Sequence, residues 1–258
     1  MQQVLISLSS FGAAEVRRHG QLWFTTLSLE AGADGVEVRG ELLNDAASEL
    51  PAIAQAVRGR GGHLVYSSPE GLWSVDSALD SAALQRGLAA ARTLGAARLK
   101  MSIGGFAAAS SATLPQLAAA LEGGGVELVI ENDQTVAAGT LPALATFFAA
   151  TQAAGLPLGM TFDMGNWHWT GECPQQAAHS LAARVRYVHC KGVQRQPRKW
   201  IAVPLADSAA PWRAVLRAMP RAVPWAIEYP LVGDDLLAVT RDEIAHLRAV
   251  SASFGVAA

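Results

Sequence analysis

Leu158-Gly-Met-Thr-Phe-Asp163 and, 27 residues further along the chain, Val185-Arg-Tyr-Val-His-Cys190 are two short apolar runs that end on polar side chains. Between them, Cys173–Ala183 is rich in alanine and long enough for a helix. A strand, a helix and a second strand in this order form a βαβ unit, in which the two strands are parallel. The pair of runs therefore predicts neighbouring parallel strands in an α/β fold.

The same spacing extends along the chain in both directions. Eight such runs have starts separated by 27 to 39 residues, the length of one strand, one helix and two loops. We predict strands at Val4–Ser9, Gly35–Arg39, His63–Ser67, Ala97–Ser102, Val126–Glu131, Leu158–Asp163, Val185–Cys190 and Pro224–Tyr229. We predict helices at Leu50–Arg60, Ser81–Leu94, Leu114–Leu121, Leu141–Ala154, Cys173–Ala183, Pro211–Ala218 and Thr240–Ala249. This is the inventory of a single (β/α)₈ TIM barrel over residues 1–258.

Local signals indicate where several of these helices begin and end. Asp80 or Ser81 precedes an apolar run and is expected to cap a helix. Thr240 with Glu243 three residues later matches a capping box. Gly95 follows a predicted last turn, where a left-handed residue ends many helices.

An open, doubly wound sheet is the alternative α/β architecture. It usually carries a glycine-rich phosphate loop after the first strand. Leu8-Ser-Ser-Phe-Gly-Ala-Ala14 matches neither G-x-G-x-x-G nor G-x-x-x-x-G-K-[ST]. The closed barrel is therefore the favoured prediction.

The composition is that of a globular protein without excess positive charge. Apolar residues make up 51% of the chain and charged residues 16%, which excludes a disordered protein. The net charge is −2, so we expect no nucleic-acid partner. The uncharged stretch Gln134–Phe162 is interrupted by proline and glycine, which argues against a membrane span. Two cysteines and a start without a positively charged leader predict a cytoplasmic location.

Polar side chains gather at the carboxyl ends of the predicted strands, where TIM barrels carry their active sites. Because side chains alternate along a strand, several of them are expected to share the inward face. These are Glu37 with Arg39, Lys100 with Ser102, and His189 with Lys191.

Four residues at these strand ends form a candidate metal site. Glu131, Asp163 and Glu228 would place three carboxylates beside the imidazole of His189. Carboxylates this close repel one another unless a cation lies among them. Three oxygen donors and one nitrogen donor suit one divalent ion, which is Mn²⁺, Mg²⁺, Co²⁺ or Zn²⁺. Each residue alone is more often structural, so the hypothesis depends on all four together.

Five short motifs surround these positions: Gly35-Val-Glu-Val-Arg39, Ile130-Glu-Asn-Asp133, Phe162-Asp-Met-Gly-Asn-Trp167, Val188-His-Cys-Lys191 and Ile227-Glu-Tyr-Pro230. Together they resemble the xylose isomerase-like TIM barrels, the sugar phosphate isomerase/epimerase group. The resemblance covers nearly the whole chain and is strongest to epimerases linked with 2-ketogluconate utilisation in bacteria.

In the ketose 3-epimerase branch of this family, one metal ion is held by Glu, Asp, His and Glu from strands 5 to 8. The resemblance therefore implies the same four ligands as above. It also implies that Arg195, six residues after His189, contacts substrate. The chain departs from that branch at two positions, with Asn166 in place of a second histidine and Ala137 in place of a second glutamate.

The implied activity is that of a metal-dependent sugar isomerase or epimerase, acting on a ketose, a keto-sugar acid or a sugar phosphate. A proton next to a carbonyl is removed and returned through an enediolate. Glu131 and Glu228 are the expected acid and base, in an order that the sequence leaves open. Family members often form dimers or tetramers, so a homo-oligomer is one option.

Positive side chains at the mouth indicate an acidic substrate. Lys100 and Lys191 are two of only three lysines, and with Arg39 they are placed to bind a carboxylate or phosphate. Glu37 is a further candidate for substrate binding; alternatively, Lys100 and Arg39 merely neutralise it. Trp167 is expected either to stack on sugar carbons or to lie in the core or a dimer interface.

Three other functions compete with this prediction. A metal-dependent dehydratase of a keto-sugar or keto-cyclitol would use the same enolate and expel a hydroxyl group. An endonuclease IV-type enzyme shares the barrel but needs a histidine-rich zinc cluster, and the chain has six histidines in all. A non-catalytic sugar-binding barrel is the third alternative.

Overall fold

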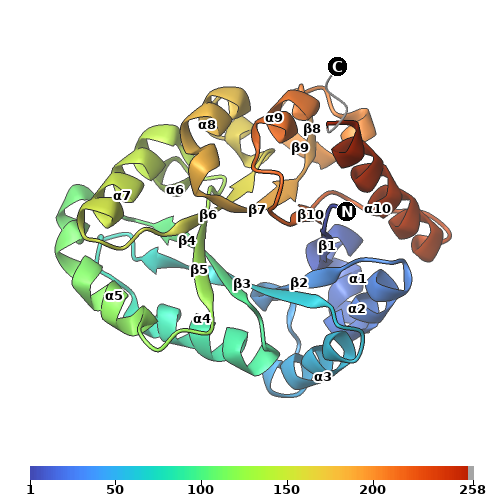
Figure 1. Cartoon of the computed structure of the whole chain (residues 1–258), viewed down its shortest axis with the longest axis horizontal. Coiled ribbons are helices and arrows are strands. Elements are labelled where there is room, and N and C mark those ends of the chain that lie inside the picture. The colour runs from blue at the N-terminus through green and yellow to red at the C-terminus, as the bar shows by residue number, and fades with distance from the viewer. Residues whose placement is uncertain (255–258) are drawn as a thin grey trace.

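Eight parallel strands close into a barrel in the order β1-β10-β7-β6-β5-β4-β3-β2, and helices surround it (Figure 1). The computed structural model describes residues 1–254. The barrel strands are β1 (Val4–Ser7), β2 (Gly35–Arg39), β3 (His63–Trp73), β4 (Arg98–Gly104), β5 (Glu127–Glu131), β6 (Gly159–Asp163), β7 (Val185–Cys190) and β10 (Trp225–Ile227). Each lies within or overlaps a strand expected from the sequence, so the predicted (β/α)₈ TIM barrel is confirmed.

Ten α-helices occupy the segments between and after the strands in the described residues. They are α1 (Ala13–His19), α2 (Gln21–Glu30), α3 (Ala46–Arg58), α4 (Ser81–Leu94), α5 (Leu114–Leu121), α6 (Val136–Gly139), α7 (Leu141–Ala153), α8 (Pro174–Leu181), α9 (Trp212–Ala218) and α10 (Leu236–Ser253). Within residues 1–254, none of these helices combines the length and apolar character that crossing a bilayer requires.

Helix α2 was not predicted because its buried face is partly polar. Gln21, Thr25 and Ser28 are all fully buried. The hydroxyl groups of Thr25 and Ser28 donate to backbone carbonyls one turn earlier, at 2.8 and 2.7 Å. Gln21 bonds both backbone groups of Arg39, at 2.8 Å each, and so ties α2 to the end of β2. These hydrogen bonds allow polar side chains to be buried. Because the buried face is partly polar, the apolar residues of α2 do not show a clear helical period in the sequence.

A second unpredicted element is the antiparallel hairpin of β8 (Gly192–Arg195) and β9 (Trp200–Val203). It follows β7 directly and precedes α9 in the chain. Strand β3 is also longer than predicted, because it continues past Ser67 through a register shift to Trp73. Both extensions lie beyond the carboxyl ends of the predicted strands, on the side where the polar residues gather.

The barrel interior changes from apolar to polar along the strand direction. A small apolar cluster fills the middle of the barrel: Leu5, Val65, Tyr187 and Ala226. Two residues further along the chain in each case are Ser7, Ser67, His189 and Glu228. Because alternate residues of a strand share a face, this second layer also points inward. A layer of polar side chains therefore lies directly above the apolar layer, towards the carboxyl ends of the strands.

The helix-end predictions are partly right. Asp80 caps α4 by accepting from the backbone N–H of Ala83 at 2.8 Å, and Gly95 ends that helix in the left-handed region with φ of 71°. The Thr240 capping box is wrong, because α10 starts four residues earlier. Its cap is Asp235, which accepts from the backbone N–H of Ala238 at 2.9 Å.

We expect Asp235→Ala to lower the free energy of unfolding by about 1 kcal/mol, because it leaves a helix N–H without its partner. Asp235→Asn retains an oxygen acceptor and is the matched control. Urea unfolding followed by circular dichroism measures both variants. Equal stability of Asp235→Ala and wild type would contradict the assigned cap.

Candidate active site at the barrel mouth

The carboxyl ends of the strands bring the predicted polar residues together. Glu37 comes from β2, Lys100 from β4, Glu131 from β5, Asp163 from β6 and His189 from β7. Glu228 directly follows β10, the neighbour of β7 in the barrel. All six are buried or nearly so, although every one of them is charged or titratable.

His189 lies at the centre of this cluster. Its Nδ1 atom is 2.8 Å from Oε2 of Glu228, 2.9 Å from Oε1 of Glu131 and 3.8 Å from Oδ2 of Asp163. One donor atom from each of these four residues lies within 4.8 Å of the other three. The four residues predicted to bind a metal ion are therefore close enough to share one.

Glu37 holds the other side of the imidazole ring. Its Oε2 is 2.8 Å from Nε2 of His189, and the carboxylate has no exposed surface. Burial by itself raises the pKa of Glu37, but His189 and Lys100 outweigh it and lower the pKa to about 2. An ionised carboxylate only accepts hydrogen bonds, so Nε2 carries a proton and Nδ1 faces the other three carboxylates.

Three positive side chains neutralise this cluster. Lys100 Nζ lies 2.9 Å from Glu131 and 3.2 Å from Glu37. Lys191 Nζ lies 2.6 Å from Asp163 and 2.7 Å from Glu228. Arg39 pairs with Glu228, and with Glu37 at 3.4 Å. Four carboxylates thus face three permanent cations and one imidazole.

The pKa directions follow from this crowding. Burial alone raises the pKa of Glu131, but Lys100 and His189 lower it below its usual value. Burial alone would also raise the pKa of Glu228, but the positive charges of His189 and Lys191 outweigh burial and hold this pKa well below its usual value. Burial lowers the pKa of His189, yet Glu228 and Glu37 raise it well above the ordinary range. The metal-free cluster therefore favours an imidazolium among ionised carboxylates.

Two asparagines of the sequence motifs fix Asp163 in place. The Asn132 side chain donates to the carbonyl of Asp163 and accepts from its N–H, both at 2.9 Å. The Asn166 side chain donates to the carbonyl of Asn132 at 2.9 Å. Backbone N–H groups of Gly165 and Asn166 donate to Oδ1 of Asp163 at 2.8 and 3.0 Å. No role was predicted for Asn132, although its place directly after Glu131, the last residue of β5, is a signal in the sequence.

The structure does not bring Arg195 or Trp167 into this cluster. Arg195 is exposed on β8, with its guanidinium 5.4 Å from the ring centre of Trp200. Trp167 is fully buried and packs on Phe162, with ring centres 5.4 Å apart. Its position matches the alternative that places it in the core, and leaves no free face for a sugar.

Two pockets open beside the cluster. The smaller, about 200 Å³, is lined by Ser9, Ser10, Lys191, Ala202 and Glu228 together with Tyr229 and Pro230. The larger, about 600 Å³, lies on the side of β3 and β4 and is lined in part by Trp73, Ser102 and Asp133. The hairpin reaches the mouth at Ala202, which is part of β9.

Solved structures with this arrangement of elements are known. A xylose isomerase domain protein from Alicyclobacillus acidocaldarius superposes with a TM-score of 0.68 at 18% identity, covering 99% of both chains. An L-ribulose 3-epimerase gives 0.70 at 17% identity, covering 98% of this chain and 96% of that one. The chain has the xylose isomerase-like TIM-barrel fold. The resemblance drawn from the sequence motifs is confirmed at the level of the fold.

The solved structures that share this fold are not all named as isomerases or epimerases. The probable 3-DHS dehydratase AsbF from Bacillus anthracis superposes on this chain with a TM-score of 0.69 at 12% identity, covering 95% of this chain and 98% of that one. No protein-family model and no curated protein matches the chain. The reaction has to be argued from the side chains at the mouth.

We expect Glu37→Ala to lower the free energy of unfolding by about 3–5 kcal/mol, because it removes the carboxylate that contacts Nε2 of the buried His189 and one of the two carboxylates that contact the buried Lys100. The matched control is Glu41→Ala, which removes a partner of Arg39 that is 34% exposed. That change is expected to cost at most about 1 kcal/mol. Urea unfolding measures the stability of both variants. Equal losses of unfolding free energy would contradict the structural role given to the buried Glu37.

Proposed function

We propose that this protein is a divalent-metal-dependent sugar isomerase or epimerase that moves a proton next to a carbonyl group. The observation that carries the proposal is the convergence of Glu131, Asp163, His189 and Glu228, with donor atoms within 4.8 Å of one another. The cluster lies at the carboxyl ends of the barrel strands, the end at which TIM-barrel enzymes act.

The donor set fits a divalent cation of hard or borderline character, such as Mn²⁺, Mg²⁺, Co²⁺ or Zn²⁺. Glu131, Asp163, His189 and Glu228 would hold such a cation, and the N–H at Nε2 of His189 would still donate to Glu37. Cys190 offers no thiolate, because burial raises the pKa of its thiol. Oxygen and nitrogen donors alone therefore define the site.

When bound, such a cation supplies positive charge that stabilises the negative charge developing on the substrate oxygens. Glu131 and Glu228 reach the cluster from β5 and from the end of β10. One carboxylate removes the proton from carbon and the other returns a proton to the opposite face, which inverts the centre. Return of the proton to the adjacent carbon interconverts a ketose and an aldose.

The cations at the mouth support an anionic substrate. Lys191 and Arg39 contact Asp163 and Glu228, whose oxygens belong to the candidate metal ligands. With those oxygens bound to a divalent cation, Lys191 and Arg39 would be free to bind a carboxylate or phosphate of the substrate. A keto-sugar acid or a sugar phosphate is accordingly the proposed substrate class.

We expect wild-type protein with Mn²⁺ to exchange the carbon-bound proton next to the carbonyl of 2-ketogluconate or another keto-sugar acid in D₂O. Glu228→Gln should slow this exchange by about 10²-fold or more, because it removes a base. The control is Glu41→Gln. Like Glu228, Glu41 contacts Arg39, but it lies outside the cluster. Proton NMR gives the exchange rate, and circular dichroism checks that each variant is folded.

The same NMR experiment separates the competing reactions. Deuterium uptake with retention of all hydroxyl groups supports epimerisation or isomerisation, whereas loss of water supports the dehydratase. Retention of most of the exchange rate in folded Glu228→Gln would contradict the role given to this carboxylate.

We expect Lys191→Met to bind Mn²⁺ about tenfold more tightly than wild type, because the ammonium group and the cation compete for oxygens of Asp163 and Glu228. Lys199→Met, at the exposed hairpin tip, is the matched control. Isothermal titration with Mn²⁺ measures the affinities. No Mn²⁺ binding by wild type would contradict the proposed metal site, and weaker binding by Lys191→Met would contradict the competition.

A further inference from the structure

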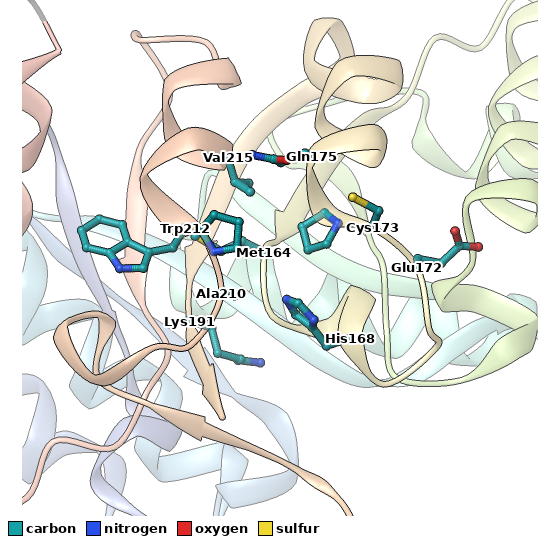
Figure 2. Close-up of a pocket in the computed structure, with 11 residues that line it drawn as sticks. Met164, His168, Glu172, Cys173, Gln175, Lys191, Ala210, Trp212 and Val215 are labelled. Carbon is teal, nitrogen blue, oxygen red and sulfur yellow. The ribbon is translucent and has the colours of Figure 1, made fainter. Parts of the chain in front are cut away.

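A third pocket, of about 220 Å³, lies beside the barrel mouth, between the N-terminal ends of α8 and α9 (Figure 2). Its walls are mainly apolar and include Met164, Cys173, Pro174, Pro211, Trp212 and Val215. Met164, Trp212 and Val215 are buried, so these walls belong to the packed body of the protein. The proposed reaction gives this pocket no role.

Two residues connect this pocket with the candidate metal centre. Met164 directly follows Asp163, one of the proposed ligands. Lys191 lines this pocket and also the mouth pocket that contains Glu228. In Figure 2, Lys191 and His168 lie along the same side of the pocket. A ligand that fills both spaces would pass the side chain of Lys191.

The chemistry of the walls selects the occupant. A free sugar carries a hydroxyl group on nearly every carbon, and each hydroxyl buried against Met, Pro, Trp or Val without a partner costs free energy. An apolar ring loses nothing of this kind and gains from leaving water. A dry protein cavity of about 150 Å³ is known to hold benzene, so a pocket of 220 Å³ has room for one six-membered ring.

One polar atom in the walls has no partner. Nε2 of His168 is buried and makes no hydrogen bond within the described residues. Burial lowers the pKa of His168 and so favours its neutral ring.

We propose that this pocket is a subsite for an apolar six-membered ring attached to the sugar, so that the substrate is a glycoside or ester of a keto-sugar acid. The inference rests on the proposed function, since it places the sugar part at Glu228 and Lys191. Pro174, Pro211 and Val215 line the space for the ring together with Met164, and the exposed Cys173 lies at its edge.

Cys173 provides a readout that needs neither metal nor turnover. It is exposed and lines the pocket, whereas Cys190, the other cysteine, is fully buried. Phenol and phenyl β-D-glucuronide are therefore expected to slow modification of Cys173 by Ellman's reagent, while glucuronate alone leaves the rate unchanged. The glucuronide should reach half-protection at a concentration at least about tenfold lower than phenol, because it also contacts the mouth.

Filling the pocket should abolish this protection. Val215→Trp places a large ring in the space, and Ala210→Phe does so from a less buried position if the first variant does not fold. Val232→Trp, at a position 79% exposed, is the matched control and should retain protection. Persistent protection in a folded, filled variant would overturn the proposal.

Two further outcomes are decisive. If phenol and the glucuronide fail to slow the reaction of Cys173, or glucuronate slows it equally, the pocket does not bind rings. If the glucuronide protects no better than phenol, the pocket is separate from the mouth and the substrate assignment is overturned. If Mn²⁺ does not bind the wild-type protein, the proposed function is contradicted, but the result on ring binding is unaffected.

Discussion

The buried contact between Glu37 and His189 is the constraint on which the barrel mouth depends. It joins β2 to β7 across the barrel interior, at 2.8 Å and with no exposed surface on either side chain. An ion pair removed from water stabilises only when its remaining hydrogen-bonding groups are satisfied. Here Ser7 and Lys100 occupy the other oxygen of Glu37, at 3.2 Å each. The pair therefore sets the orientation of the imidazole and the position of the neighbouring lysine.

The rest of the cluster follows from that orientation. With Nε2 committed to Glu37, Nδ1 faces Glu131, Asp163 and Glu228, and these carboxylates require positive charge nearby. Lys100, Lys191 and Arg39 supply it from three different strand ends. The positive charges already neutralise the carboxylates. A divalent cation could bind them only if the proton on Nδ1 of His189 or the ammonium group of Lys191 were displaced. Metal binding, proton release and substrate charge are thus linked in the proposed enzyme.

Much of this arrangement was predictable because it follows from local periodicity. The spacing of apolar runs gave the eight strands, and alternation along each strand gave the inward residues. Helix α2 and the β8–β9 hairpin were not predicted. Gln21, Thr25 and Ser28 are buried but satisfied by hydrogen bonds, which weakens the hydrophobic signal. The cap of α10 was misplaced because Thr240 is buried inside the helix, where its hydroxyl donates to the carbonyl of Leu236.

The amino-acid sequence by itself determined where the strands lie along the chain and which side chains alternate towards the interior, because both depend on neighbours within a few residues. Only the tertiary structure decided which cation pairs with which carboxylate, since those distances depend on how the barrel closes and how its strands are staggered. The same closure buried Trp167 against Phe162, left Arg195 on the hairpin and enclosed the apolar pocket between α8 and α9. The walls of that pocket come mainly from two distant segments, residues 164–175 and 210–215, which no local pattern brings together.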